Sequence, residues 1–248
     1  MDWGRAKLIL ILSFFMLNVV LGYQLWTTRS DLLEFDANTA SAAEEIQRLL
    51  KSKNIQVSVE MPKEIPRLKE IVVKFDEKMK SDKKIPVSAP FKYSPILGKG
   101  ATKDAAARAV IPNMDAYQYD PVLSVNGVYV FHQLYNGVPM FEVKLELNEQ
   151  NGLITSYSQG YVEVQSESDQ KEQKVISPYT VLRSLIETYF PSGSVVNSIK
   201  LGYHGQVFNS QTMFMVPYWR VSLGNGDGDI YYVNALNGAV ELPQKNRK

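Results

Sequence analysis

Apolar positions are densest at the start of the chain, where residues 8–26 (LILILSFFMLNVVLGYQLW) carry no charge. A helix of that length rises ~28 Å at 1.5 Å per residue, close to the ~30 Å hydrocarbon core of a bilayer. Arg5 and Lys7 precede the run, so the positive-inside rule keeps the tail at 1–7 in the cytoplasm. The pattern predicts a single transmembrane helix at 8–26.

A cleaved signal peptide is the alternative for the same run. Its strictly apolar part, 8–21, has the length of a signal-peptide core, and Val20-Leu21-Gly22 offers a cleavage site. The apolar positions continue to Trp26, which favours a retained anchor. In both cases we expect the rest of the chain outside the cytoplasm, beginning with a stalk at 27–40.

Three small or polar residues interrupt the apolar run: Ser13, Asn18 and Gly22. Asn18 and Gly22 are four apart and therefore share one face of a helix. In lipid, an amide seeks a hydrogen-bond partner and a glycine lets a second helix approach closely. These residues are candidate contacts with another transmembrane helix. The alternative is that Asn18 bonds to the backbone of its own helix.

The exported part begins with helical spacing and continues with alternation. Ser41-Ala-Ala-Glu44 has the form of a capping box, and the apolar residues that follow lie on one helical face. Apolar and polar positions then alternate over 55–61 and 68–75, which predicts two strands. The pattern loosens between Asp76 and Asp120.

Regular alternation returns over 127–164 and predicts three consecutive antiparallel strands. Asn136-Gly137 and Asn151-Gly152 separate them, and Asn-Gly is typical of tight hairpin turns because both residues tolerate positive φ. These elements form the first predicted lobe, 41–164. Residues 165–174 (QSESDQKEQK) contain no apolar residue and are interpreted as a linker.

The order of helix and strands repeats in the second predicted lobe, 175–248. Ser177-Pro178 is typical of an N-cap followed by proline in the first turn, and Pro191 ends the helix. Four apolar segments rich in valine and tyrosine follow. The sequence therefore predicts an α+β protein in which each lobe is one helix packed on an antiparallel meander.

The amino-acid composition limits the reactions and partners that are possible for this chain. The chain has 248 residues, a net charge of +1 and no cysteine, which removes disulfides and thiol catalysis and gives no drive toward nucleic acid. His132 and His204 stand far apart in strand patterns without a catalytic motif, so we interpret both as structural or surface residues. We expect no catalytic residue, no cofactor and no metal.

Two segments keep a second interpretation. In GNGDGDIYY, Asn225, Asp227 and Asp229 have the spacing of calcium ligands, but the later positions do not fit an EF-hand loop, and a glycine-rich turn is the simpler interpretation. Tyr218 and Trp219 lie in an aromatic strand. Core packing is the default there, and a partner-binding strand is the alternative.

The chain resembles the YycI (WalI) family. The resemblance rests on Met1-Asp2-Trp3 followed by a lysine and a single span, and on the segments LYNGVPMFEV and VPYWRVSL…YYVNALNGAVE. The lobes are also similar to the broader PepSY-like class. The region between Asp76 and Asp120 matches least.

The resemblance implies a non-enzymatic regulator that stays anchored in the cell membrane of a Gram-positive bacterium. Such proteins associate with the sister protein YycH and with the cell-wall sensor kinase WalK of a two-component system, through membrane helices and exported domains. The family supplies no catalytic residue to map onto this chain. The alternative function is a secreted or anchored PepSY-like module that binds a peptide or inhibits a protease.

Overall fold

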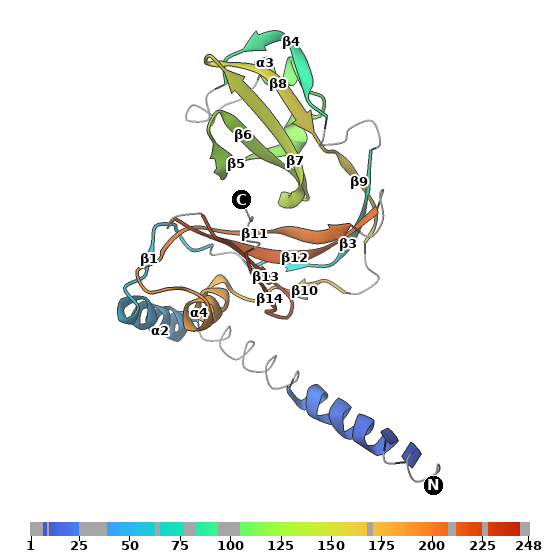
Figure 1. The fold of residues 1–248 in the computed structure, drawn as a ribbon, viewed down its shortest axis with the longest axis vertical. Helices are drawn as coiled ribbons and strands as arrows, with labels where there is room; N and C mark the ends of the chain where they lie inside the picture. The colour runs from blue at the N-terminus through green and yellow to red at the C-terminus, as the bar shows by residue number, and fades with distance from the viewer. Residues whose placement is uncertain are drawn as a thin grey trace.

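The computed structural model describes residues 7–8, 10–24, 39–62, 65–76, 83–93, 105–167, 171–207, 212–224 and 228–243. Two bodies of strands lie one above the other, and a helix that includes residues 10–24 projects away from the lower one (Figure 1). We call residues 85–159 the upper body. The lower body consists of 39–75 together with 162–241.

Most of the upper body is an antiparallel sheet with a short helix. Its elements are β4 (Ile85–Phe91), α3 (Ala105–Val110), a 3-10 turn (Met114–Ala116), β5 (Tyr117–Val125), β6 (Val128–Tyr135), β7 (Val138–Gln150) and β8 (Leu153–Gln159). The two predicted Asn-Gly hairpins are confirmed: Asn136 and Asn151 have φ of 49° and 52°, and the glycines that follow have φ of 80° and 79°.

The lower body takes its elements from both ends of the chain. They are α2 (Thr39–Ser52), β1 (Gln56–Val57), β2 (Arg67–Leu68), β3 (Ile71–Phe75), β9 (Val162–Glu167), β10 (Gln173–Lys174), α4 (Pro178–Thr188), β11 (Val195–Val207), β12 (Thr212–Leu223), β13 (Ile230–Asn234) and β14 (Val240–Glu241). The predicted N-cap of α4 is confirmed, because the Thr180 amide donates to Ser177 Oγ at 3.2 Å.

One continuous path of strand pairs, β14-β13-β12-β11-β7-β6-β5, links the bodies. Its neighbours are antiparallel except β11 and β7, which are parallel and meet at Tyr203 and Met140. A second connection runs from β8 into β9, which pairs with β3 below. The α+β class is therefore confirmed, with β7 the long strand shared by both bodies.

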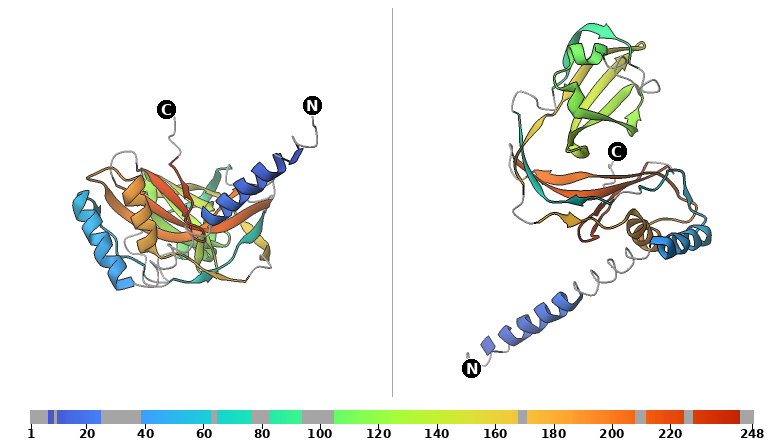
Figure 2. Two further views of the ribbon diagram at one scale, coloured as in Figure 1. Left: turned by 90° about the horizontal axis from the view of Figure 1, so that it is seen from below. Right: turned by 180° about the vertical axis from the view of Figure 1, so that it is seen from behind.

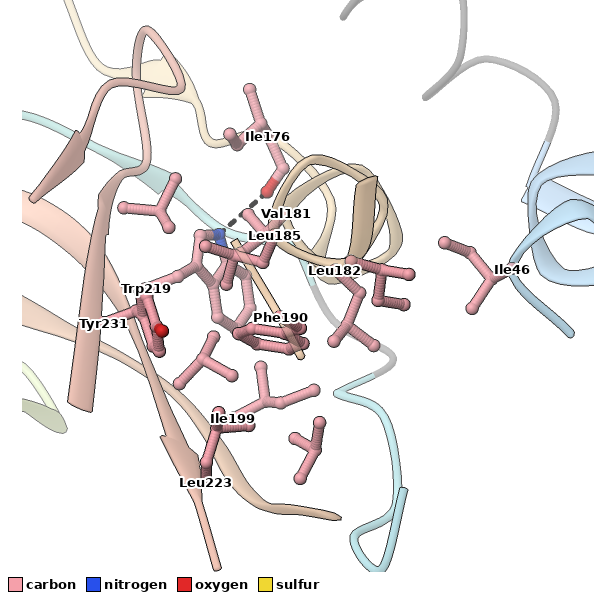
Figure 3. Packing of buried hydrophobic residues seen from close by; sticks show 14 of the residues in the cluster. Ile46, Ile176, Val181, Leu182, Leu185, Phe190, Ile199, Trp219, Leu223 and Tyr231 are labelled. Carbon is pink, nitrogen blue, oxygen red and sulfur yellow. Dashed lines mark hydrogen bonds between the residues drawn. The ribbon is translucent and has the colours of Figure 1, made fainter. Parts of the chain in front are cut away.

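Helices α2 and α4 lie side by side on the same face of the lower sheet (Figure 2). Val181, Leu185 and Ile186 of α4 pack into one buried cluster with Trp219 of β12 (Figure 3). Ile46 of α2 belongs to that cluster too. This burial removes the apolar faces of both helices from water, which stabilises the fold by roughly 1.5–3 kcal/mol for each large side chain.

The packing differs from the prediction that each lobe is a helix on its own meander. The helix expected to head the first lobe packs instead beside α4, and β3 pairs with β12. Hydrophobic periodicity identifies a buried face but not its partner, which explains the difference. The helix also begins at Thr39, so Ser41 lies inside its first turn rather than before it.

Strand pairing also reaches into the segment interpreted as a linker. β9 continues to Glu167, and β10 pairs with β2 through Gln173 and Leu68. Within the described residues, no helix has both the length and the apolar content needed to cross a membrane. Ile9, Leu25 and Trp26 of the predicted span lie outside those residues.

Candidate functional site

Strand alternation gives the lower sheet one apolar face and one polar face. Leu201, Trp219 and Val233 are cross-strand neighbours on the side of the helices. The adjacent row, Lys200, Arg220 and Tyr232, points to the other side because successive residues of a strand alternate. That polar face meets the upper body, and two clusters of charged residues form there.

The first cluster, which we call the Arg220 cluster, consists of Asp120, His132 and Arg220. The Arg220 guanidinium donates to Asp120 Oδ2, and its Nη1 lies 3.2 Å from His132 Nε2. The same His132 nitrogen lies 3.0 Å from Asp120 Oδ2. The three side chains are at most 1% exposed. Since β5 and β6 belong to the upper body and β12 to the lower, the cluster ties the two bodies together.

Burial and the neighbouring charges fix the protonation of this cluster. Burial alone would raise the pKa of Asp120, but a hydrogen bond from His132 and the charge of Arg220 outweigh it and hold that pKa well below its ordinary value. Burial lowers the pKa of His132, and the Arg220 charge adds to that effect. The cluster is therefore an ion pair with a neutral imidazole beside it.

The second cluster, the His204 cluster, consists of Glu142, His204, Tyr218, Tyr232 and Glu241. His204 Nδ1 contacts Glu142 Oε1, and its Nε2 lies 3.0 Å from Glu241 Oε2. The Tyr232 ring stacks on the imidazole, with centroids 4.1 Å apart and planes 7° apart. The Tyr218 ring meets it edge-on, and the Tyr218 hydroxyl donates to Glu241 Oε1 at 2.7 Å.

The electrostatics of this cluster are opposite to those of the first. Burial disfavours a charged His204, but the hydrogen bonds and charges of Glu142 and Glu241 outweigh it and raise the pKa of His204. Burial raises the pKa of Tyr232 to about 12. Burial and the hydrogen bond to Glu241 raise the pKa of Tyr218 to about 12, so both hydroxyls keep their protons near neutral pH.

Phe141 of β7 lies between the two clusters. The Arg220 guanidinium carbon sits 4.5 Å from the centre of its ring, a cation–π contact. The same ring contacts His132 and Tyr232, with centroids 5.6 Å and 5.8 Å away. It packs over Gly202 of β11, where a Cβ atom would come within 2.3 Å of Phe141 Cζ. Glycine at 202 thus allows β7 and β11 to approach.

The chemistry available at this junction is that of ion pairing and proton binding. Within the described part of the chain, no group of three histidine, aspartate or glutamate side chains is arranged to hold a metal ion. Asn225 and Asp227, two of the three residues with calcium-ligand spacing, lie outside the described residues, and Asp229 is half-buried.

The predicted site residues lie in two separate places. Trp219 is fully buried, and its indole nitrogen donates to the Ile176 carbonyl at 2.9 Å, so it has the core role that the sequence left open. Tyr218, on the opposite face, belongs to the His204 cluster. Asn18 donates to the Phe14 carbonyl at 2.7 Å within its own helix. Ser13 and Gly22 are exposed on that helix.

Sequence reasoning missed the partners of both histidines. Glu142 and Glu241 stand in ordinary strand patterns, and neither carries a local signal. Arg220 was detectable, because it is a charge inside the apolar strand TMFMVPYWRVSL, and such a charge is rarely buried without a partner. Its partner Asp120 is 100 residues away in the sequence.

Comparisons with known proteins identify one family and a distant similarity to a solved structure. A family profile described as "YycI protein" matches residues 87–236, more than half of the chain. No curated protein matches. Among solved structures, the chain is similar to the crystal structure of an uncharacterized protein from Eubacterium rectale ATCC 33656, at 12% identity and a TM-score of 0.34. The match covers 47% of this chain and 42% of that one.

Proposed function

Because the chain belongs to the YycI family, we propose that it is a non-enzymatic, membrane-anchored regulator of a WalK-like sensor histidine kinase. The observation that carries the proposal is the family match, which runs from β4 to the turn after β13 and so includes almost all of the upper body, the lower body from β9 to β13, and both histidines. In this proposal the chain acts with a YycH-like sister protein and has no catalytic site of its own.

Regulation without chemistry needs only differential binding. A kinase with two signalling states responds to any partner that binds one state better than the other. A coupling free energy of ~1–3 kcal/mol changes the output ~5–150-fold, which a few side-chain contacts can supply. In the proposed arrangement, residues 8–26 span the membrane and the two bodies lie outside the cell.

The helix at the start of the chain is the proposed site of contact with the kinase spans. Asn18 and Gly22 share a face, and Ser13 adds a polar group. Apart from the backbone of its own helix and its chain neighbours, no atom of the described residues lies within 4 Å of a Cβ placed on Gly22, so that position is open to a second helix. Asn18 already has a backbone acceptor, and it can exchange that bond for one to a neighbouring helix.

The central experiment is cross-linking in membranes followed by purification of the full chain. We expect a histidine kinase and a sister protein in the purified complex. A chain that starts at Asp31 should fold and yet fail to change kinase output, because it lacks the proposed span. Full regulation by that shortened chain would refute the role of the helix.

A single substitution tests the helix face more finely. Asn18→Leu should reduce recovery of the kinase, whereas Val20→Leu, on the other side of the same helix, should leave it unchanged. Equal recovery with Asn18→Leu and the wild type would contradict the assignment of Asn18. Equal loss in both variants would point to a general effect on insertion and would contradict it as well.

A further inference from the structure

The contacts of His204 fix the charge of its ring by geometry. Both ring nitrogens face carboxylate oxygens, Nδ1 toward Glu142 and Nε2 toward Glu241. A neutral imidazole has one N–H and one lone pair, so it can donate to only one of them. The doubly protonated ring donates to both. The stacked face of Tyr232 further favours a cation at this position.

We propose that His204 is a proton-operated latch: the charged ring holds β14 and β7 against β11, and loss of one proton releases β14. The latch is independent of the proposed kinase regulation, because it concerns this chain alone. It operates outside the Arg220 cluster, which keeps its ion pair when His204 changes charge.

The structure indicates which nitrogen gives up its proton. Within the described residues, Glu142 Oε2 has no hydrogen-bond partner, so His204 is the main neutralising contact of that carboxylate. Glu241 has a second donor in the Tyr218 hydroxyl. The remaining proton therefore stays on Nδ1, and the Nε2 lone pair then faces the Glu241 carboxylate. That contact is repulsive.

The strand that carries Glu241 is the weakest element at the junction. β14 has two residues, and within the described part of the chain it pairs only with β13, through Glu241 with Tyr232 and Val240 with Val233. Glu241 is also more exposed than Glu142, with 43% against 21% of the side chain accessible. β7, by contrast, is paired with β6 and β8 as well as β11. Repulsion at Nε2 consequently displaces β14 rather than β7.

The titratable groups that face His204 come from four elements. They are Glu142 on β7, Tyr218 on β12, Tyr232 on β13 and Glu241 on β14. The two tyrosines stay protonated below about pH 12, so near neutral pH the charge balance depends on the two carboxylates and the histidine. The raised pKa of His204 means that the latch is closed below pH 6.5 and opens as the pH rises through that pKa.

Proton NMR of the full-length chain in detergent micelles tests the latch. The chain has two histidines, and His204→Gln identifies the signal of each by removing one. We expect the His204 signal to titrate above the ordinary value and to titrate lower in Glu241→Gln. Glu149→Gln is the matched control, because Glu149 also accepts a tyrosine hydroxyl, that of Tyr129, but is not among the partners of His204.

Amide exchange of β14 provides the second readout. After correction for intrinsic exchange, the protection of the Glu241 amide should be lost as the pH rises in the wild type and in Glu149→Gln. In His204→Gln it should be independent of pH. A His204 signal that titrates at or below the ordinary value would overturn the proposal. The same pH-dependent loss of protection in His204→Gln would overturn it too.

Discussion

The two histidines of this protein occupy similar positions and have opposite electrostatics. Each lies on a strand at the junction between the bodies, and each has a carboxylate within hydrogen-bonding distance. His132 is fully buried, and burial lowers its pKa, with a smaller contribution from the charge of the Arg220 guanidinium that it faces. His204 is 17% exposed and faces two glutamates, which raise its pKa.

Burial lowers the pKa of both imidazoles, so the two histidines differ in whether their charged neighbours outweigh burial. In the Arg220 cluster, one carboxylate and one guanidinium neutralise each other, so a neutral imidazole completes the cluster. In the His204 cluster, two carboxylates need a proton on the ring to approach neutrality. The first cluster is insensitive to pH near neutrality, and the second depends on it.

The largest expected effect comes from breaking the ion pair. Arg220→Met leaves the Asp120 carboxylate buried beside a neutral imidazole, and removing one partner of a buried pair typically costs about 3–5 kcal/mol. Chemical denaturation of the full chain measures this loss in the free energy of unfolding.

Two further variants serve as controls for this loss of stability. Arg183→Met removes an arginine that is 38% exposed and paired with Glu45 and Glu187, and it should cost at most about 1 kcal/mol. The double variant Asp120→Asn, Arg220→Met should lose less than the sum of the two single losses, because neither charge is then left alone. Equal losses for Arg220→Met and Arg183→Met would contradict the buried ion pair.

The next largest effect is expected from Gly202→Ala, which should disturb both clusters through Phe141. Gly202→Ala places a Cβ atom 2.3 Å from Phe141 Cζ and 2.7 Å from the Pro139 carbonyl oxygen, and overpacking of this kind costs about 1–3 kcal/mol. A lower melting temperature should accompany shifts of both histidine signals.

Gly224→Ala is the control for that substitution. Its Cβ atom would meet the side-chain amide of Asn197, an exposed and flexible group that can move aside. The variant should therefore melt close to the wild type. A melting temperature of Gly202→Ala equal to that of Gly224→Ala would mean that the close contact of β7 with β11 is not needed.

The pH dependence of stability should differ in sign between the two histidines. The pKa of His204 is raised in the folded state, so its contribution is complete below pH 6.5 and is lost as the pH rises through that pKa. The pKa of His132 is lowered, so its contribution is present above pH 6.5 and is lost as the pH falls.

Unfolding free energies at several pH values test these signs. The difference between the wild type and His204→Gln should shrink as the pH rises from 6.5 through the raised pKa of His204, because the folded state loses its extra proton there. The difference between the wild type and His132→Gln should shrink as the pH falls from 6.5 through the lowered pKa of His132. If both free-energy differences changed with pH in the same direction, the predicted opposition between His132 and His204 would be wrong.

The smallest expected effect concerns one hydroxyl. Tyr218→Phe removes the hydrogen bond to Glu241 and should cost about 0.5–1.5 kcal/mol. Tyr129→Phe removes a matching hydrogen bond to Glu149 and should cost a similar amount. Thermal melts measure both costs, while only Tyr218→Phe should change the NMR signal of His204. A shift in both variants would show that the signal is not a local probe.

Local features of the fold were predictable, and pairings between distant segments were not. The Asn136-Gly137 turn and the Ser177 cap depend on residues within a few positions, where residue type restricts the backbone directly. The pairing of β3 with β12 joins residues about 140 positions apart, such as Val73 and Met213. Alternation marks both strands as half-buried without specifying which partner each will have.

The candidate site was predictable to a similar degree. Both histidines were predicted to lie in strands, and they lie on β6 and β11. The glutamates that give His204 its role come from strands 62 and 37 residues away in the sequence. Only the folded register brings these three side chains together, so the charge of the His204 ring could not be predicted from the residues next to it in the sequence.

The shared strand β7 also gives the molecule a mechanical property. β7 meets β11 at Met140, near one end, and continues to Gln150 in the upper body. Ten residues of strand span ~33 Å, so a tilt of ~10° about Met140 displaces the far end by ~6 Å. A small rotation at Met140 would therefore move the distal hairpin by a much larger distance.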